Sequence, residues 1–380
     1  MDFSWSEEQR QLEESVIAFA RRELRTDPGV EEHEFSRGLW RKCAAFGLQG
    51  LPISEEHGGQ GADALTTMLA LEALGYACTD NGLIFSINAH VWSAAMPILR
   101  FGTEAQKRHY LPGLCDGTLI GVQGMTEPES GSDAFGLRTR ASQRDAEFLL
   151  TGTKTFVTNA PIADVFIIFA STDPSLGSMG ISAFIVDREA PGLTVGKAFE
   201  KMGLRSSPMS ELFFDGCVVP EENLLGKLGN GMAIFNHSID WERACILASA
   251  VGAMQRQVEE SVAYARSRYQ FGQAIGRFQA VSHRIADMRV RTDAARLLLY
   301  NAGFAKQQGV KAPAAESAIA KLFISEAWLQ NSLDALQNHG AYGYMTETGV
   351  ERDVRDSIAG RIYSGTSDIQ RNIIASSLGL

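Results

Sequence analysis

Apolar residues recur at a helical period in the first part of the chain. Ser6 and Gln9 have the spacing of a capping box, the pattern that begins a helix. The apolar side of that helix carries Leu12, Val16, Phe19 and Ala20. Thr103 to Gln106 is a second capping-box pattern. These patterns predict an all-α N-terminal domain at residues 1–117.

The residue pattern changes in the middle of the chain, where short runs are rich in β-branched and aromatic residues. Gly, Pro, Asp and Ser separate these runs at the spacing of strands and turns. The runs are 165–169, 181–186, 193–195 and 211–214. No helix-length amphipathic segment lies between them, so we expect short connections. The pattern predicts an antiparallel β-barrel domain at residues 118–225.

The helical period returns after Gly226, Gly229 and Gly231, which we interpret as a turn that leads into a helix. Three apolar stripes follow. They are Val251, Met254, Val258 and Val262; Ile285, Met288, Thr292, Ala295 and Leu299; and Ile319, Leu322, Phe323, Leu333 and Leu336. Long helices with such stripes predict a C-terminal four-helix bundle at residues 226–380. The expected fold class is therefore α+β.

Composition and charge exclude several classes of protein. The 380 residues carry a net charge of −10 and no long basic run, which excludes nucleic acid or an anionic membrane as the main partner. The longest apolar stretch, Ala244 to Met254, is too short to span a bilayer. The chain enters a helical pattern at once, so we expect no signal peptide. The five scattered cysteines lack metal-ligand spacing. These features predict a cytoplasmic protein with free thiols and no metal site.

A search for common cofactor and catalytic motifs excludes most familiar sites. There is no G-x-G-x-x-G after a strand, so a Rossmann dinucleotide site is not predicted. The P-loop, nucleophile-elbow and zinc-helix patterns are also absent. Any redox cofactor is therefore expected in a fold of another kind.

A set of ordered motifs resembles the acyl-CoA dehydrogenase family across essentially the whole chain. Each is a weak signal alone, but chance agreement of all of them in this order is very improbable. They are 124–133 (GMTEPESGSD), 153–160 (TKTFVTNA), 201–208 (KMGLRSSP), 268–272 (RYQFG) with Gln279, 337–344 (QNHGAYGY), 350–356 (VERDVRD) and 362–371 (IYSGTSDIQR).

The resemblance implies the fold just predicted, with FAD between the β domain and the bundle. It implies that Thr126 and the Phe156-to-Thr158 strand border the flavin ring, with Ser132 near the pyrophosphate. The other cofactor positions in this part of the chain are Met125 and Gly131. Ser367 to Gln370 is also a capping-box pattern, so a helix N-terminus would face the cofactor phosphates or ribose.

The resemblance also implies that a neighbouring subunit completes the FAD site. The positions that would reach the neighbour's FAD are Arg268, Gln270, Phe271, Gln279, Gln337 and Gly340, with Thr366 and Asp368 at the other end of the contact. A cofactor shared between chains implies a homo-oligomer, a tetramer built as a dimer of dimers.

The implied reaction needs a carboxylate that takes the α-proton of a thioester while the β-hydrogen leaves as hydride to flavin N5. Many family members place that glutamate where this chain has Ser364, and serine cannot act as this base. A second arrangement, as in isovaleryl-CoA dehydrogenase, places it on the first long bundle helix, at the position of Glu242 here. By itself Glu242 is typical of a solvated charge cluster, but with Ser364 the catalytic interpretation is favoured. Arg243 would be its electrostatic partner, and the Ser364 backbone N–H would bind the thioester carbonyl.

Three segments resemble one subgroup in particular, the dehydrogenases of prolyl groups on peptidyl carrier proteins in natural-product biosynthesis. They are 159–166, 241–245 and 364–370. The expected function is thus FAD-dependent α,β-dehydrogenation of a prolyl-like aminoacyl or acyl group on a carrier protein. Residues 202–208 depart from the subgroup, because they have the general acyl-CoA form without extra cysteines. A short- or branched-chain acyl-CoA dehydrogenase of catabolism is the alternative enzyme. An inactive flavin-binding scaffold is the alternative of another class, and Glu242 argues against it.

Overall fold

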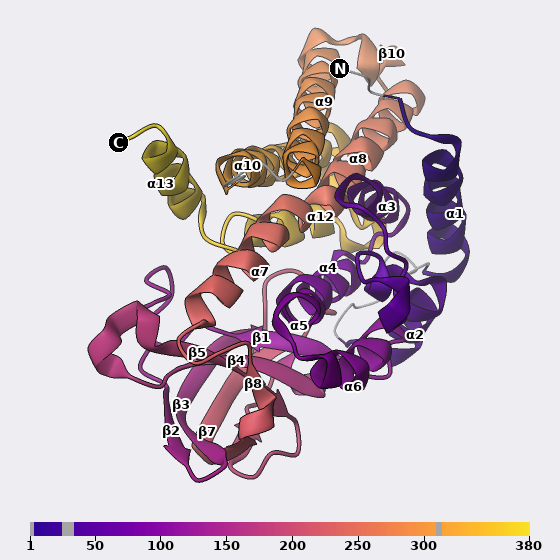
Figure 1. Ribbon diagram of the computed structural model, residues 1–380. Coiled ribbons are helices and arrows are strands. Elements are labelled where there is room, and N and C mark those ends of the chain that lie inside the picture. Colours follow the sequence, from indigo (N-terminus) through magenta and orange to yellow (C-terminus); the bar gives the residue numbers. More distant parts are fainter. Residues whose placement is uncertain (1–3, 25–33, 309–313) are drawn as a thin grey trace.

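The computed structural model describes residues 4–24, 34–308 and 314–380 of the chain. The sheet of the middle domain lies at one end of the molecule, and the long C-terminal helices rise from it (Figure 1). The N-terminal helices pack beside both. The predicted boundaries at 117/118 and 225/226 stay predictions.

The first part of the described chain is helical, as predicted. Its helices are α1 (Glu7–Glu23), α2 (Arg37–Phe46), α3 (Ala64–Ala77), α4 (Asn81–His90), α5 (Met96–Phe101) and α6 (Glu104–Cys115). Both predicted capping boxes form, Ser6 with Gln9 and Thr103 with Gln106. In each, the cap hydroxyl and the Gln side chain satisfy N–H groups that a helix leaves unpaired at its start.

Helices α4 and α5 are joined by a π-helical turn, Val91–Ala95, into one continuous stretch, Asn81–Phe101. This stretch is long and apolar enough to cross a membrane, although the sequence analysis placed the longest apolar run elsewhere. However, 89% of its most apolar window is buried inside the fold, as in a core helix of a soluble protein. The absence of a membrane partner stays a prediction.

The middle of the chain forms a mixed sheet. Its strands are β1 (Gly121–Gly124), β2 (Arg140–Arg144), β3 (Glu147–Thr158), β4 (Val165–Ser171), β5 (Ile181–Asp187), β6 (Leu193–Val195), β7 (Met209–Pro220) and β8 (Leu224–Leu225). The strand order is β6-β7-β3-β2-β4-β5-β8, with β1 against β4. The four predicted runs correspond to β4, β5, β6 and β7, and most pairings are antiparallel.

The prediction of a wholly antiparallel sheet needs correction, because β1 and β2 both run parallel to β4. The cause is where the chain enters the sheet. Ile120, just before β1, exchanges hydrogen bonds with Asp164, just before β4, so both strands leave the same edge in the same direction. The seven residues of β4 are all buried.

The C-terminal part is a helical bundle centred on α10 (Ala314–His339). Its other helices are α7 (Gly231–Cys245), α8 (Ala248–Ser267), α9 (Gln279–Gln307), α11 (Ala341–Tyr344), α12 (Val350–Ala359) and α13 (Ser367–Ser377). A hairpin, β9 (Tyr269–Gln270) with β10 (Gln273–Ala274), joins α8 to α9. Helix α10 packs against α7, α8, α9, α12 and α13. The glycine-rich turn leads into α7 at Gly231, as predicted.

The third predicted stripe does not form the buried face of α10. Ile319 and Leu333 are 39% and 42% exposed, respectively. The buried face instead includes polar Lys321 and Ser325 beside Trp328. An apolar stripe predicts that one face of a helix is covered, but it does not specify what covers it. In a single chain, part of this stripe on α10 is exposed to solvent.

Candidate active site

The structure brings together two positions that lie 122 residues apart in the chain, Glu242 and Ser364. Glu242 lies in the last turn of α7, and Ser364 lies in the turn between α12 and α13. The Ser364 hydroxyl donates a hydrogen bond to Oε1 of Glu242, and the pair is partly buried. Trp241, the residue before Glu242, stacks on Trp92 with ring centroids 6.0 Å apart.

Burial raises the pKa of Glu242 above its ordinary value. The hydrogen bond from Ser364 opposes this rise, as do the charges of Arg243 and Lys321 and a hydrogen bond from Ser93. A carboxylate with a raised pKa is a stronger base than one in water, and the surrounding donors favour its ionised form.

Three side chains hold the carbonyl groups of the Ser364–Gly365 turn. Arg243 donates from Nε to the Ser364 oxygen at 3.0 Å, and Lys321 donates from Nζ to the Gly365 oxygen at 2.7 Å. Gln370 donates to both oxygens, at 3.2 and 2.8 Å. None of the hydrogen bonds among the described residues uses the N–H of Ser364. The turn thus has fixed carbonyls and an N–H available to a ligand.

This geometry refines two predictions about the turn. Arg243 was expected to be the electrostatic partner of Glu242; its charge does lower the pKa of Glu242, but its hydrogen bond goes to the Ser364 carbonyl. The capping box expected at Ser367 is wrong. Thr366 is the N-cap and accepts from the Ile369 N–H at 3.3 Å, because Gln370 is engaged with the preceding turn.

The motifs expected to border a flavin also meet in space. The N–H of Thr155 donates to the Thr126 carbonyl at 2.9 Å, which places 124–133 beside β3. The pairing of β3 with β7 shifts register between Lys154 and Val157, a bulge at which Phe156 takes a positive φ of 54°. Bulges commonly re-aim a side chain near a functional site. Phe156 is accordingly 62% exposed although it lies within a strand.

A buried ion pair lies next to Thr126 and the β3 bulge. It was not predicted from the sequence. Lys154 is fully buried, and its Nζ lies 2.7 Å from Oε1 of Glu127 and 3.2 Å from the Met125 carbonyl. Burial lowers the pKa of Lys154 to about 8. Burial alone would raise the pKa of Glu127, but Lys154 and Thr139 hold it below its ordinary value. The only sequence signal was a lysine within a predicted strand, in the run 153–160.

Helix α4 links the β3 motif to the Glu242 site. Asn159, after β3, donates from its side chain to the Ser86 carbonyl at 3.0 Å. The ring of the adjacent Phe85 lies 4.7 Å from that of Tyr363, which precedes Ser364. On the other side, Ser238, one turn before Glu242, lies 3.2 Å from the Gln123 side chain on β1. The predicted base therefore lies between the β domain and the bundle.

The positions expected to reach a neighbouring FAD form a separate cluster at the far end of the bundle. They lie around the β9–β10 hairpin and the end of α10, away from the sheet (Figure 1). The guanidinium of Arg268 lies 5.8 Å from the Tyr342 ring centroid, close to Gln337 and Gly340. Phe271 is 93% exposed and packs against Phe278, just before Gln279. One chain therefore does not bring them to Thr126 or Phe156.

The remaining predicted cofactor positions are near the surface. Gly131 and Ser132 are exposed in the turn after β1, and Asp368 is exposed in the first turn of α13, where it pairs with Arg371 at 3.3 Å. Gln270 is also exposed on the hairpin. These residues are accessible to a ligand or to a second chain.

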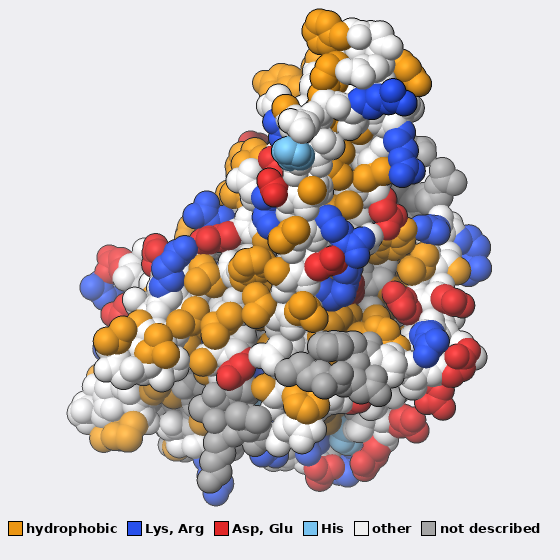
Figure 2. All heavy atoms as spheres, turned by 90° about the horizontal axis from the view of Figure 1, so that it is seen from above, with side chains coloured by type: hydrophobic (Ala, Val, Ile, Leu, Met, Phe, Trp, Pro, Cys, Tyr) orange, Lys and Arg blue, Asp and Glu red, His pale blue; other side chains and the backbone are white. Residues whose placement is uncertain are grey.

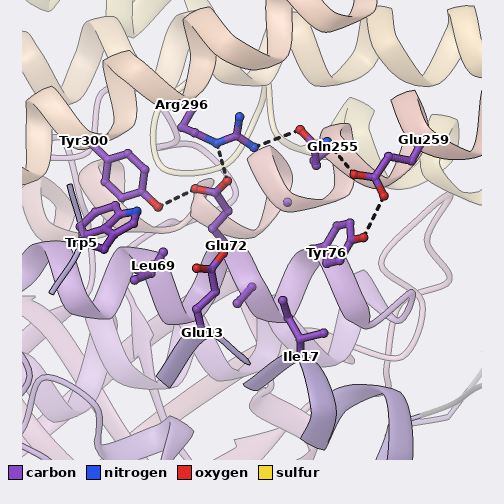
Figure 3. A pocket seen from close by; sticks show the side chains of 12 residues that line it. Trp5, Glu13, Ile17, Leu69, Glu72, Tyr76, Gln255, Glu259, Arg296 and Tyr300 are labelled. Carbon is purple, nitrogen blue, oxygen red and sulfur yellow. Dashed lines mark hydrogen bonds and ion pairs between the residues drawn. The ribbon is translucent and has the colours of Figure 1, made fainter. Parts of the chain in front are cut away.

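A cavity of about 310 Å³ lies elsewhere, between α1, α3, α8 and α9 (Figure 3). Two of the three acids that line it, Glu72 and Glu259, have hydrogen-bond partners within the protein, whereas Glu13 has none among the described residues. Glu72 accepts from Arg296 at 2.7 Å and from Tyr300 at 2.6 Å, and Glu259 accepts from Tyr76 at 2.8 Å. None of the predicted site residues lines it. We interpret it as a polar seam that joins the N-terminal helices to the bundle.

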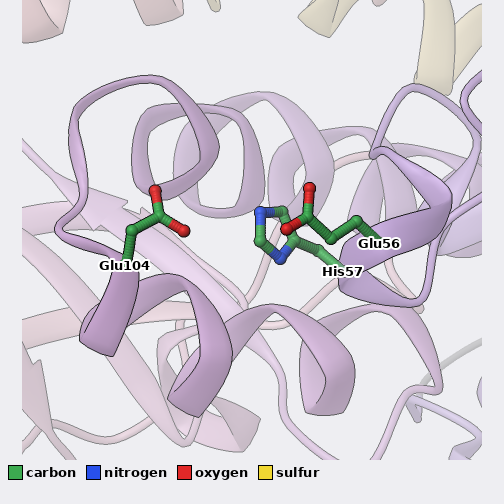
Figure 4. A group of neighbouring side chains, drawn as sticks. All are labelled: Glu56, His57 and Glu104. Carbon is green, nitrogen blue, oxygen red and sulfur yellow. The ribbon is translucent and has the colours of Figure 1, made fainter.

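Glu56, His57 and Glu104 place their potential metal-ligating atoms within 4.8 Å of one another (Figure 4). Both glutamates are exposed, and Glu104 pairs with Lys107 at 2.9 Å. Exposed acids that have a partner of this kind do not define a metal site.

Comparison with known proteins decides the family. The N-terminal, middle and C-terminal domains of acyl-CoA dehydrogenase match residues 6–118, 123–217 and 229–379. A protein of Pseudomonas fluorescens named L-prolyl-[peptidyl-carrier protein] dehydrogenase is 44% identical over 100% of both chains.

The chain belongs to the acyl-CoA dehydrogenase family.

Two solved structures agree with this family assignment. The crystal structure of the prolyl acyl carrier protein oxidase AnaB has a TM-score of 0.97 and 48% identity, and it covers 99% of this chain and 100% of its own. The FAD complex of PigA has a TM-score of 0.97 and 42% identity over 100% of both chains. The acyl-CoA dehydrogenase fold predicted from the motifs is confirmed, and the protein is an oxidoreductase that acts on CH–CH bonds.

Proposed function

We propose that this protein is an FAD-dependent dehydrogenase that introduces a double bond between the α and β carbons of a prolyl-like aminoacyl group held as a thioester on a carrier protein. The observation that carries the proposal is the Glu242–Ser364 site, where a carboxylate of raised pKa lies beside a backbone N–H that has no partner among the described residues. The names of the P. fluorescens relative and of AnaB support the carrier-bound prolyl substrate.

The residues present fit FAD. A flat ring needs exposed apolar surface with polar groups at its edge, and exposed Phe156 lies beside the partly exposed hydroxyls of Thr126 and Thr158. At the start of α13, the Ser367 hydroxyl is buried and has no partner among the described groups. A helix N-terminus with a spare hydroxyl suits a phosphate or ribose. Bound FAD would supply the hydride acceptor.

The other steps fall to residues of this chain. Glu242 would take the α-proton, because its carboxylate is held in a partly dry site. The N–H of Ser364 would donate to the thioester carbonyl and stabilise the charge that develops there. The fixed carbonyls of Ser364 and Gly365 keep that N–H in place without reorganisation.

We further propose that a second copy of the chain completes the FAD site, within a tetramer built as a dimer of dimers. The cluster around Arg268 and Phe271 lies far from the β domain of its own chain (Figure 1). Helix α9 exposes Val290, Leu297 and Phe304 at heptad spacing. Apolar side chains also spread over the face seen from above (Figure 2). A monomer rarely exposes such surface, whereas a helix–helix interface uses it.

Other parts of the proposal rest on less specific features. None of the five cysteines, which all lie within the described residues, forms a disulfide, and all are buried, which supports a cytoplasmic location. The acyl-CoA alternative is favoured by residues 202–208, which have the general acyl-CoA form and are tied into the fold by the Leu204 N–H to Asp356 at 2.6 Å. Anaerobic bleaching of the bound flavin by each class of thioester distinguishes the two substrate classes.

The rate of flavin reduction should depend on pH through a single ionised carboxylate. Glu242 must be deprotonated to accept a proton, and burial raises its pKa. The rate should therefore fall as the pH drops through that raised pKa, and reach a plateau above it. Stopped-flow bleaching of bound FAD by a prolyl carrier protein, under anaerobic conditions between pH 5 and 9, measures this fall in rate, the acid limb of the pH profile. A rate independent of pH in this range would argue against a carboxylate base.

A further inference from the structure

The side chain of Ser364 makes the direct polar contact with the carboxylate of Glu242. The hydroxyl donates to Oε1, while Arg243 directs its Nε to the carbonyl of the same serine. Arg243 and Lys321 act on the carboxylate through charge, and Ser93 acts through a further hydrogen bond. Ser364 therefore both carries the available N–H and contacts the base through its side chain.

The backbone at Ser364 is in an unusual conformation for this contact. Its φ is 55°, in the left-handed region that side chains other than glycine rarely adopt, and Gly365 follows with φ 87°. A non-glycine residue in this region is strained and persists only where its surroundings hold it. The chain thus keeps a side chain at a position where glycine would be easier to accommodate.

The surroundings do hold this conformation. Lys321 is fully buried and donates to the Gly365 carbonyl, and Gln370 bridges the carbonyls of Ser364 and Gly365. A Cβ on Gly365 would lie 2.8 Å from the Gln370 amide nitrogen and 3.3 Å from the Arg243 guanidinium. The turn is therefore closely packed, and the direction of the Ser364 hydroxyl is set before any ligand arrives.

We propose that the Ser364 hydroxyl is the positioning residue of the base: it holds Oε1 of Glu242 in one orientation and leaves Oε2 to take the α-proton. This inference rests on the proposed function, because it assumes that Glu242 is the base. It assigns the serine a role separate from its N–H, and the two roles can be separated by changing the side chain alone.

The charged and titratable groups around Glu242 come from several elements. Arg243 lies on the same helix, Lys321 comes from α10, and Tyr363 precedes Ser364. The charge of Arg243 and that of protonated Lys321 favour the ionised carboxylate, and burial lowers the pKa of Lys321 to about 7, so this amine also titrates within the pH range of the test. Burial first, and then the charge of Glu242, raise the pKa of Tyr363, so this phenol stays neutral through the working range. Removing the Ser364 hydroxyl leaves these groups in place and takes away one donor to the ionised form.

The test compares Ser364→Ala and Ser364→Gly with the wild type as FAD-loaded enzymes. Alanine removes the hydroxyl and still has a Cβ that disfavours the positive φ at this position. Glycine removes the hydroxyl and adopts that φ without strain. In both variants the acid limb of flavin reduction should move up by roughly one to two pH units, the range expected for one hydrogen bond to a charged group. At pH values on the acidic side of both limbs, flavin reduction by the variants should be roughly 10- to 100-fold slower than by the wild type.

Ser325→Ala is the matched control, because Ser325 is a buried hydroxyl on α10 that bonds only within its own helix, to the Leu322 carbonyl. It should leave the limb unchanged. Unshifted limbs in both Ser364 variants would overturn the proposal, as would a loss in the alanine variant that glycine fully restores. Failure of the base itself is a separate result. It would appear as normal flavin reduction by Glu242→Gln, whatever the Ser364 variants do.

Discussion

Glu242→Gln should yield a folded protein that binds FAD and fails to bleach it with substrate. The change keeps the size of the side chain and its bond to Ser364 while removing the group that accepts a proton. A positioned general base contributes roughly 10²- to 10⁴-fold, so anaerobic flavin reduction should slow by at least that factor. The flavin spectrum before substrate is added should match that of the wild type, because Glu242 is not among the residues proposed to hold FAD.

A matched variant and a rescue strengthen this test. Glu260→Gln removes another glutamate whose pKa burial raises, on α8, and should reduce flavin at the wild-type rate. The double variant Glu242→Gln, Ser364→Glu moves the carboxylate to the position that many family members use and should recover part of the rate. Normal reduction by Glu242→Gln alone would contradict the assignment of the base.

Glu127→Gln should destabilise the protein by about 3–5 kcal/mol, the range for breaking a buried ion pair by removing one charge. The cost is large because water does not reach the Lys154 ammonium: its side chain is wholly buried, and Glu127 is only 6% exposed. The unpaired cation would also disturb the Met125 carbonyl that it contacts, and with it the adjacent Thr126. We expect a lower midpoint of urea unfolding and a reduced FAD content.

The control for this second prediction removes both charges. Glu127→Gln, Lys154→Met keeps one amide oxygen for the Thr139 N–H, which Oε1 of Glu127 accepts at 3.0 Å, and loses the acceptor of the Arg138 N–H, which bonds to Oε2 at 2.6 Å. It also leaves no unpaired charge in the core. Its unfolding midpoint should lie much closer to that of the wild type than the single variant's does. Equal midpoints for the single variant and the wild type would show that the pair contributes little.

The sequence predicts most elements where local pattern and burial agree. The β4 run is all apolar and is buried on both faces, so its strand was found. By contrast, β1 reads Gly-Val-Gln-Gly, and β2 is mostly polar, so neither has a strand pattern. Their parallel pairing with β4 depends on where the chain enters the sheet. The exposed Ile319 and Leu333 on α10 show the same limit, because an apolar stripe does not specify which partner covers it.

The candidate site was predicted through resemblance to a family, and its internal contacts were not. The motifs assigned Glu242 and Ser364 to one site, and the structure brings the two side chains into contact although 122 residues separate them. Nothing local in the sequence indicated that Lys321 reaches the Gly365 carbonyl, because a lysine within an apolar helix is usually a surface residue. The bond from the Ser364 hydroxyl to Glu242 depends on a positive φ that no sequence pattern predicts for serine.

The most direct test of the proposed function is anaerobic bleaching of the bound flavin by two classes of thioester. Purified protein is mixed in parallel with L-prolyl and other aminoacyl carrier proteins and with a panel of short acyl-CoAs, and the flavin absorbance is followed. We predict rapid bleaching by the prolyl carrier protein and little or none by the acyl-CoAs. Bleaching by a free acyl-CoA, with no response to any carrier-bound aminoacyl group, would contradict the account and assign the enzyme to acyl-CoA oxidation.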